Sequence, residues 1–178
     1  MPRQTTLVSP EFCIDSCVFL DFWNIDDPNR RYGIDGFAGH WKYLEKLIAE
    51  GRIIAPVSVK EELLKSTNEK LQEWLKEHDH MFVELDGNSV SWLAKITQKY
   101  QAYTRSAFGR EPTDAIIIAL AKAEGLTVIT SEQFRPTHNP EDPKIPNVCG
   151  DKDINVPCVN IRKFFADADV SYEITEKT

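Results

Sequence analysis

The sequence predicts an α/β fold in which a parallel sheet carries helices on both faces. Short apolar runs typical of strands alternate with longer segments whose apolar residues recur at helical spacing. The segment Thr113–Ala121 is apolar almost all round, which indicates a buried helix, and the strong β run Leu126–Thr130 follows it. With 178 residues, of which 42% are hydrophobic, the chain is long enough to bury a core as one domain.

Five short runs are expected to form strands, because each is apolar or rich in β-branched residues and is bounded by turn or helix signals. The first run ends at Asp15, and the end of a strand in an α/β sheet is where such folds place their chemistry. A carboxylate at that point either caps the next helix or binds a ligand. The strands are predicted over residues 12–15, 53–55, 81–85, 126–130 and 156–159.

Seven segments show the spacing of apolar residues that is typical of helices. Gly51 and Gly125 follow two of them and are expected to end them, since glycine readily adopts the left-handed conformation found at helix C-termini. Residues 24–36 and the proline-rich residues 135–157 are predicted to be loops. The helices are predicted over residues 17–23, 37–50, 58–66, 70–76, 89–108, 113–124 and 161–166.

Two adjacent glutamates, Glu61 and Glu62, are expected to face in different directions. Ser58 precedes Glu61 by three residues, a capping-box spacing that predicts a helix beginning at Ser58. Glu61 can then pair with Lys65 four residues on, whereas Glu62 shares the inward face with Leu63. A lone carboxylate on an inward face is costly unless something binds it, so Glu62 is a candidate ligand.

Charge and cysteine content exclude some classes of protein. The net charge of −7 argues against a large basic DNA-binding surface, although a nuclease site built from carboxylates is itself acidic. The cysteines (Cys13, Cys17, Cys149 and Cys158) lack zinc-knuckle spacing and are interpreted as small buried residues in a reducing compartment. No apolar run is long enough for a membrane span or a secretory signal, so we expect a cytoplasmic protein with no membrane partner.

Four carboxylates are candidates for one shared site: Asp15, Glu62, Asp114 and Glu132. They follow strands, begin a buried helix or face inward, and such positions can converge on the carboxyl edge of a parallel sheet. Four acids meeting there would repel one another unless divalent cations bind them. Oxygen ligands without Cys or His select Mg²⁺ or Mn²⁺, which suit phosphodiester hydrolysis by polarising the phosphate and lowering the pKa of the attacking water. Hydroxyl groups that could support the acids belong to Ser16, Thr130 and Ser131.

These acidic positions and their neighbours resemble the four acidic motifs of PIN domains. The motifs here are Ile14-Asp15-Ser16, Glu62-Leu63, Thr113-Asp114-Ala115 and Val128-Ile129-Thr130-Ser131-Glu132. The resemblance extends from about residue 12 to residue 166, with Glu132 where the family often has aspartate. The segment Lys144–Cys149 is also similar to an uncharacterised bacterial and archaeal PIN-like family close to VapC-type toxins.

The resemblance implies a three-layer α/β/α sandwich formed by a single domain over residues 1–178, with a core over residues 12–166 and a loop insertion over residues 135–157. It implies an Mg²⁺- or Mn²⁺-dependent ribonuclease whose catalytic metal ligands are the four carboxylates. VapC-type toxins are held inactive by an antitoxin and are commonly dimeric. The expected partners are therefore RNA as substrate, an antitoxin protein and a second copy of the chain.

Two other functions stay open. A phosphatase of the haloacid dehalogenase type would use Asp15 as its nucleophile, but that chemistry usually needs a second aspartate where this chain has Cys17. A non-catalytic PIN-like interaction module would keep the acids as caps, first-turn acids or solvated residues. Asp21 is expected to be structural or to lie near the site entrance. Basic residues that either contact phosphate or are simply solvated are Arg30, Arg31, Arg105, Arg110, Lys144 and Lys152.

Overall fold

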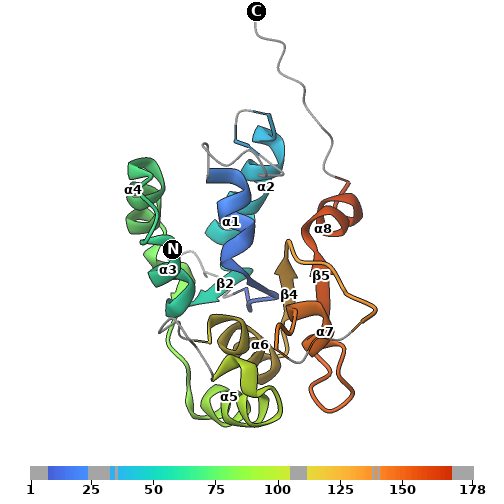
Figure 1. Ribbon diagram of the computed structural model, residues 1–178. Coiled ribbons are helices and arrows are strands. Elements are labelled where there is room, and N and C mark those ends of the chain that lie inside the picture. Colours follow the sequence, from blue (N-terminus) through green and yellow to red (C-terminus); the bar gives the residue numbers. More distant parts are fainter. Residues whose placement is uncertain are drawn as a thin grey trace, which may run out of the picture.

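The computed structural model describes residues 8–23, 33–34, 36–104, 112–137, 139 and 141–169. The strands in this part of the chain are β1 (Phe12–Ile14), β2 (Ile53–Pro56), β3 (Phe82–Val83), β4 (Thr127–Thr130) and β5 (Cys158–Asn160). They form one sheet in the order β3-β2-β1-β4-β5, and every pair is parallel (Figure 1). The predicted parallel sheet is confirmed, with the first strand at its centre.

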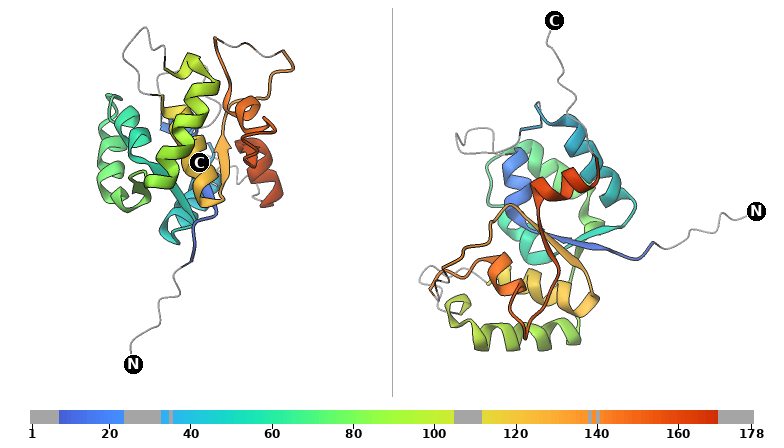
Figure 2. Two further views of the ribbon diagram at one scale, coloured as in Figure 1. Left: turned by 90° about the horizontal axis from the view of Figure 1, so that it is seen from below. Right: turned by 90° about the vertical axis from the view of Figure 1, so that its right-hand side faces the viewer.

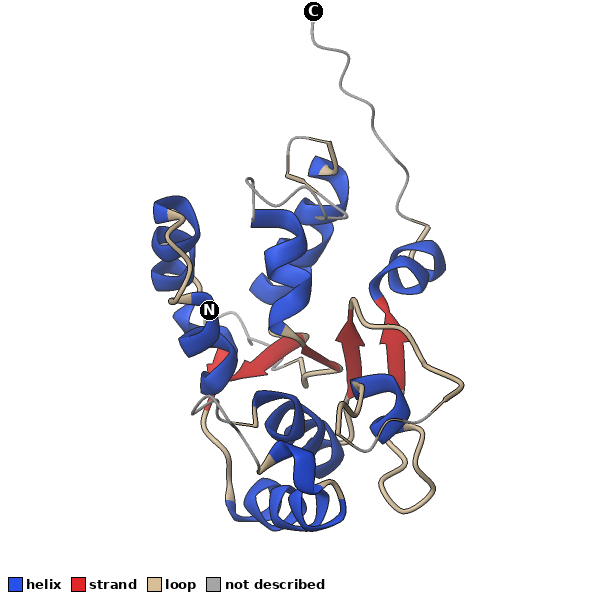
Figure 3. Ribbon diagram, viewed as in Figure 1, coloured by secondary structure: helices blue, strands red, loops and turns tan. Residues whose placement is uncertain are grey.

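Eight α-helices within the described residues pack around this sheet and complete the predicted three-layer α/β/α sandwich. They are α1 (Ser16–Trp23), α2 (Ala38–Ala49), α3 (Val57–Leu63), α4 (Glu69–Glu77), α5 (Gly87–Lys99), α6 (Thr113–Glu124), α7 (Ile145–Cys149) and α8 (Ile161–Asp167). Helices α1, α2 and α8 lie on one side of the strands, and α5 and α6 lie on the other (Figures 2 and 3). No helix among the described residues has the length and apolar character needed to cross a membrane.

The register of the sheet places three strand ends beside one another. Ile14, the last residue of β1, pairs with Ile129, and Thr130 at the end of β4 pairs with Asn160 at the end of β5. The backbone N–H of Asp15 donates to the carbonyl oxygen of Ile129 at 3.0 Å, which extends the pairing by one residue. The carboxyl edge therefore brings the residues that follow β1 and β4 into contact, as parallel pairing requires.

An aromatic cluster fixes the helix that follows the central strand. Phe19 and Phe22 of α1 are fully buried, and the ring of Phe22 lies 5.2 Å from that of Trp41 on α2. Trp74 of α4 packs against Trp41 at the same centroid separation of 5.2 Å. Aromatic rings at this separation attract one another in addition to the stabilisation gained by burying them, so the cluster holds α1 in place over the sheet. The N-terminal residues of α1, next to Asp15, are positioned by this packing.

The helix predicted over residues 89–108 is shorter and begins earlier. It is α5, which starts at Gly87 because the Asp86 carboxylate accepts hydrogen bonds from the N–H and the hydroxyl of Ser89, both at 2.7 Å. This is a side-chain N-cap one turn before the predicted start. The helix ends at Lys99, and a short 3₁₀ turn follows over Gln101–Tyr103. Residues 105–111 lie outside the described part of the chain.

Replacing Asp86 with alanine should lower the free energy of unfolding by about 1 kcal/mol, the usual cost of losing an N-cap. The pKa of Asp86 lies below its ordinary value because the Ser89 N–H and hydroxyl stabilise the charged form. Urea denaturation followed by circular dichroism measures the change. The control is Glu84→Ala, which alters an exposed acid two residues earlier. An equal loss in both variants would contradict the cap assignment.

The capping box predicted at Ser58 and Glu61 does not form. Helix α3 begins at Val57 directly after β2, Pro56 occupies the N-cap position, and no side chain caps the helix. Ser58 thus lies inside the first turn, where its hydroxyl is buried without a hydrogen-bond partner among the described residues. The two faces are nevertheless as predicted, because Val59 and Leu63 are buried and Glu61 is exposed.

The segment predicted as a long loop over residues 135–157 contains a helix. Helix α7 buries Ile145, Val148 and Cys149, which anchors the segment to the core next to α6. Pro146 lies in its first turn, a position that proline tolerates because the N–H there has no helical partner. The prediction of an uninterrupted loop from the proline content was therefore wrong for residues 145–149, which form a short helix.

Candidate active site

Asp15 is the first residue after the central strand, and the residue is only 4% exposed. Thr130 on β4 donates its hydroxyl to Asp15 Oδ2 at 2.8 Å, and the Cys17 thiol donates to the same oxygen at 2.6 Å. The Cys17 backbone N–H lies 3.4 Å from Oδ1. Burial raises the pKa of Asp15, whereas the hydrogen bonds from Cys17 and Thr130 act in the opposite direction. The carboxylate is therefore buried and held in one orientation.

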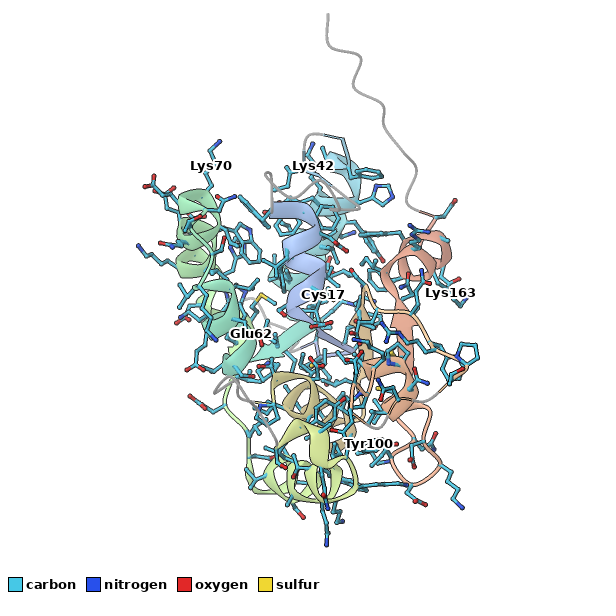
Figure 4. The ribbon with its side chains drawn as sticks, in the orientation of Figure 1. Cys17, Lys42, Glu62, Lys70, Tyr100 and Lys163 are labelled. Atoms are coloured by element: carbon cyan, nitrogen blue, oxygen red, sulfur yellow. The ribbon has the colours of Figure 1, made fainter. Side chains whose placement is uncertain are left out.

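Ser16 connects Asp15 to the second predicted acid, Glu62. The Ser16 hydroxyl donates to Glu62 Oε2 at 2.7 Å and lies 3.4 Å from Asp15 Oδ1. It therefore joins two carboxylates instead of capping α1, and Ser16 is itself the first helical residue. Glu62 reaches this position from α3, as predicted for the inward face. Figure 4 shows Cys17 at the start of α1 and Glu62 on α3, both in the central part of the molecule.

Asp114 lies in the first turn of α6, on the other side of the sheet. Burial raises its pKa to about 8, and the negative charges of Asp15, Glu132 and Glu62 contribute in that order. A carboxyl group perturbed by three other carboxylates shares one electrostatic environment with them. Asp114 therefore lies in the electrostatic environment of the other three predicted acids, which follow β1 and β4 or belong to α3.

Glu132 differs from the other acids because both oxygens of its carboxylate contact residues at the start of α7. Its Oε2 accepts the backbone N–H of Ile145 at 2.8 Å, and its Oε1 lies 3.3 Å from Lys144 Nζ. Its own N–H donates to the Thr130 hydroxyl at 3.1 Å, which ties it to the Asp15 network. Glu132 therefore belongs to the acidic cluster and also anchors the N-terminal end of α7.

The donor chemistry of this cluster fits a divalent cation. Asp15 and Asp114 both have raised pKa values because they are buried near other acids, and a bound cation would remove that penalty. The oxygen donors are hard, as Mg²⁺ and Mn²⁺ prefer. Within the described residues no three side chains of His, Cys, Asp or Glu already stand at metal-ligand spacing. The residues that would hold such an ion are Asp15, Glu62, Asp114 and Glu132.

Two residues, Cys17 and Asn160, contribute to the site without having been predicted. Cys17, interpreted from the sequence as a plain buried residue, donates to Asp15 and accepts the Ser131 N–H at 3.2 Å. Burial and the Asp15 charge raise the pKa of its thiol, so it serves as a neutral donor. Asn160 holds the exit of β4, since its amide donates to the carbonyl oxygens of Ser131 and Glu132 at 3.2 and 2.9 Å. The signal in the sequence that points to Asn160 is its position as the polar residue that ends β5, the strand next to β4.

A hollow of about 490 Å³ opens beside the acids. Cys17 and Glu132, which both belong to the carboxylate network, form part of its wall. Asp21 also lies on this wall, in agreement with its predicted place near the entrance. Two basic side chains, Arg135 and Lys144, line the same hollow. Of the basic residues singled out in the sequence, Lys144 is at the site, whereas Arg30, Arg31, Arg105 and Arg110 lie outside the described residues.

The comparison with solved structures gives two matches at low sequence identity. The VapBC2 complex from Rickettsia felis, bound to a DNA fragment from its promoter, is 15% identical, with a TM-score of 0.48 over 86% of this chain and 98% of that chain. The FitAcB complex from Neisseria gonorrhoeae is 17% identical, with a TM-score of 0.48 over 85% of this chain and 98% of that chain. The comparison with curated proteins found no match.

One protein family matches most of the sequence. Its description is "Domain of unknown function (DUF4411)", and the match covers residues 12–172. The matched range includes all five strands of the sheet and all four acids of the cluster. The chain belongs to the DUF4411 family.

Proposed function

We propose that the protein is a metal-dependent endoribonuclease of the PIN type, with Asp15, Glu62, Asp114 and Glu132 as the residues that hold Mg²⁺ or Mn²⁺. The observation that carries the proposal is the contact network at the carboxyl edge, where the Ser16 hydroxyl donates to Glu62 Oε2 at 2.7 Å and lies 3.4 Å from Asp15 Oδ1. Burial and the charges of the other three acids also raise the pKa of Asp114. Strongly perturbed carboxyls that gather at the carboxyl edge of a parallel sheet are typical of active sites. These acids belong to the four motifs that resemble the acidic motifs of PIN domains, which supports the proposal.

The chemistry of phosphodiester hydrolysis suits this arrangement. A divalent cation bound by carboxylates polarises the phosphate and lowers the pKa of the attacking water, so no side-chain nucleophile is needed. The protein's own contribution is to hold the carboxylates before any substrate arrives. Thr130 and Cys17 orient Asp15, and Ser16 spaces Asp15 from Glu62. Carboxylates held in this way would keep a bound cation in place, which limits the reorganisation needed to reach the transition state.

The two adjacent glutamates of α3 provide a matched test. Glu62→Gln should weaken Mn²⁺ binding, measured by calorimetry, by at least about tenfold, because even the loss of a residue that only supports a metal ligand has an effect of this size. The variant should also cleave a single-stranded RNA more slowly. Glu61→Gln removes the same charge from an exposed position and should leave both properties unchanged. Equal behaviour of the two variants would remove Glu62 from the site.

The same experiment separates the proposed enzyme from an interaction module. An enzyme of this type binds Mn²⁺ and cleaves RNA only when the ion is present. A chain that neither binds Mn²⁺ at millimolar concentration nor cleaves RNA would instead use the acids only for folding, and the interaction module would be the better description.

The resemblance to VapC-type toxins also suggests which partners the chain binds. We infer an antitoxin protein that holds the enzyme inactive, and a homodimer as the state of the isolated chain. Light scattering of the purified protein measures its mass directly. A mass equal to the 20.4 kDa chain would exclude the dimer.

A further inference from the structure

Phe134 presents an aromatic ring to solvent close to the acidic cluster. It is 63% exposed, more than any other large apolar side chain in the described part of the chain. It follows Glu132 by two residues and lines the 490 Å³ hollow beside the acids. It also lines a second hollow of about 630 Å³, which lies near the end of α5. An aromatic side chain shared by two hollows therefore marks the boundary between them.

The backbone next to Phe134 is held in place by α7. The side chain of Asn147 accepts the N–H of Arg135 at 2.9 Å through its oxygen and donates to the Arg135 carbonyl at 2.7 Å through its nitrogen. A pair of hydrogen bonds to one residue fixes its backbone firmly. The exposed ring is thus carried by an ordered segment, and an aromatic ring held in this way loses little entropy when a ligand stacks on it.

Cationic side chains flank the ring on the side of the acids. Lys144 Nζ lies 2.9 Å from Asp142 Oδ1 and 3.3 Å from Glu132 Oε1, and Arg135 Nη1 lies 3.0 Å from Asp142 Oδ2. The Asp142 side chain is 50% exposed, and ion pairs with exposed partners are weak. A phosphate group can therefore replace Asp142 as the partner of these cations at little cost.

The second hollow has the size and lining expected for a nucleotide. Its volume of about 630 Å³ falls within the range of small-molecule sites. Besides Phe134, its wall contains Tyr100 and Gln101, which add an aromatic ring and an amide group, and Asn147, whose amide holds the Arg135 backbone. The wall also contains Lys99 and two acids, Glu141 and Asp151, and the Lys99 ammonium group pairs with Asp151 and Asp153.

We propose that the RNA strand crosses from the acidic cluster to the second hollow over Phe134, with one base stacked on its ring. Lys144 and Arg135 would hold the phosphate between that base and the acids. This inference rests on the proposed ribonuclease function and adds the path of the strand and its contact residues. Every base has a face that can stack, but only an unpaired base can present it to a protein ring. The substrate is therefore single-stranded at this position.

The test measures RNA binding separately from cleavage. A short fluorescent single-stranded RNA is titrated with the protein in the presence of Ca²⁺, anisotropy reports the dissociation constant, and a gel confirms that the RNA stays intact. Phe134→Ala should weaken binding about tenfold, a typical effect of losing one stacked base, and Phe134→Trp should restore it. Val90→Ala, which shortens another exposed apolar residue on α5, is the control and should bind like the original chain.

A second variant tests the phosphate contact. Lys144→Met should lower the slope of log Kd against log salt concentration by about one, whereas Phe134→Ala should leave that slope unchanged. The outcomes also separate the two proposals. If the unaltered chain binds RNA and Phe134→Ala binds equally well, the strand path is wrong and the ribonuclease proposal stands. If Phe134→Ala weakens binding but the unaltered chain does not cleave RNA with Mn²⁺, the path is supported and the ribonuclease proposal fails. If the unaltered chain does not bind RNA, both are wrong.

Discussion

Asp15→Asn is expected to lower the rate of RNA cleavage by about 10²- to 10⁴-fold, which corresponds to about 3–5 kcal/mol of lost transition-state stabilisation. The side chain keeps its size, and its amide oxygen can still accept the hydrogen bonds that Thr130 and Cys17 donate to Asp15 Oδ2. The variant loses the negative charge at the centre of the proposed ligand set. Phosphoryl transfer depends almost entirely on positioning and electrostatics, so the loss of this charge should act on the catalytic rate.

The measurement is the single-turnover rate on a labelled RNA with Mn²⁺, with the fold checked by circular dichroism. Asp167→Asn on α8 is the matched control, because its aspartate is exposed and pairs only with Lys163 among the described ion pairs. It should cleave at the original rate. The same pair can be expressed in cells, where a toxin would arrest growth and Asp15→Asn would not. Equal cleavage by Asp15→Asn and the unaltered chain would refute the site assignment.

Asp114→Asn should make the metal-free protein more stable at pH 8, while cleavage is lost. The pKa of Asp114 is about 8 in the folded chain and 3.8 as the ordinary value, so the folded state favours the protonated form. The stability that this proton provides is fully present below pH 4 and is lost as the pH rises toward 8. Removing the charge should recover on the order of 2–4 kcal/mol at pH 8, less than the full shift because the side chain is only partly buried.

Thermal unfolding in EDTA at pH 5 and pH 8 checks this prediction. The melting temperature of Asp114→Asn should exceed that of the unaltered chain at pH 8, and the gap should shrink at pH 5. Adding excess Mn²⁺ should raise the melting temperature of the unaltered chain more than that of the variant, because the ion binds the folded state. A variant that is less stable than the unaltered chain at both pH values would show that the Asp114 carboxylate stabilises the fold as a first-turn acid of α6.

The local elements of the fold could be predicted because their causes are local. The apolar run before Asp15, the all-apolar segment that became α6 and the glycine at position 125, whose φ is 71°, each act within a few residues. The inward face of Glu62 followed from helical spacing alone, even though the capping box at Ser58 did not form. The predicted helix boundaries were less accurate, because neighbouring residues can each serve as the N-cap. At the start of α5 the cap is Asp86, whereas the prediction began the helix at Ser89.

By itself, the sequence determined which carboxylates follow strands or face inward, and hence the four candidate acids. Tertiary structure decided what surrounds them. Cys17 and Thr130 meet on one oxygen of Asp15 only because β1 and β4 are neighbours in a given register. Lys144 and the N–H of Ile145 reach Glu132 only because α7 folds back onto the sheet edge. These contacts join residues far apart in the chain, and their geometry depends on the register and the loop path, which no local pattern encodes.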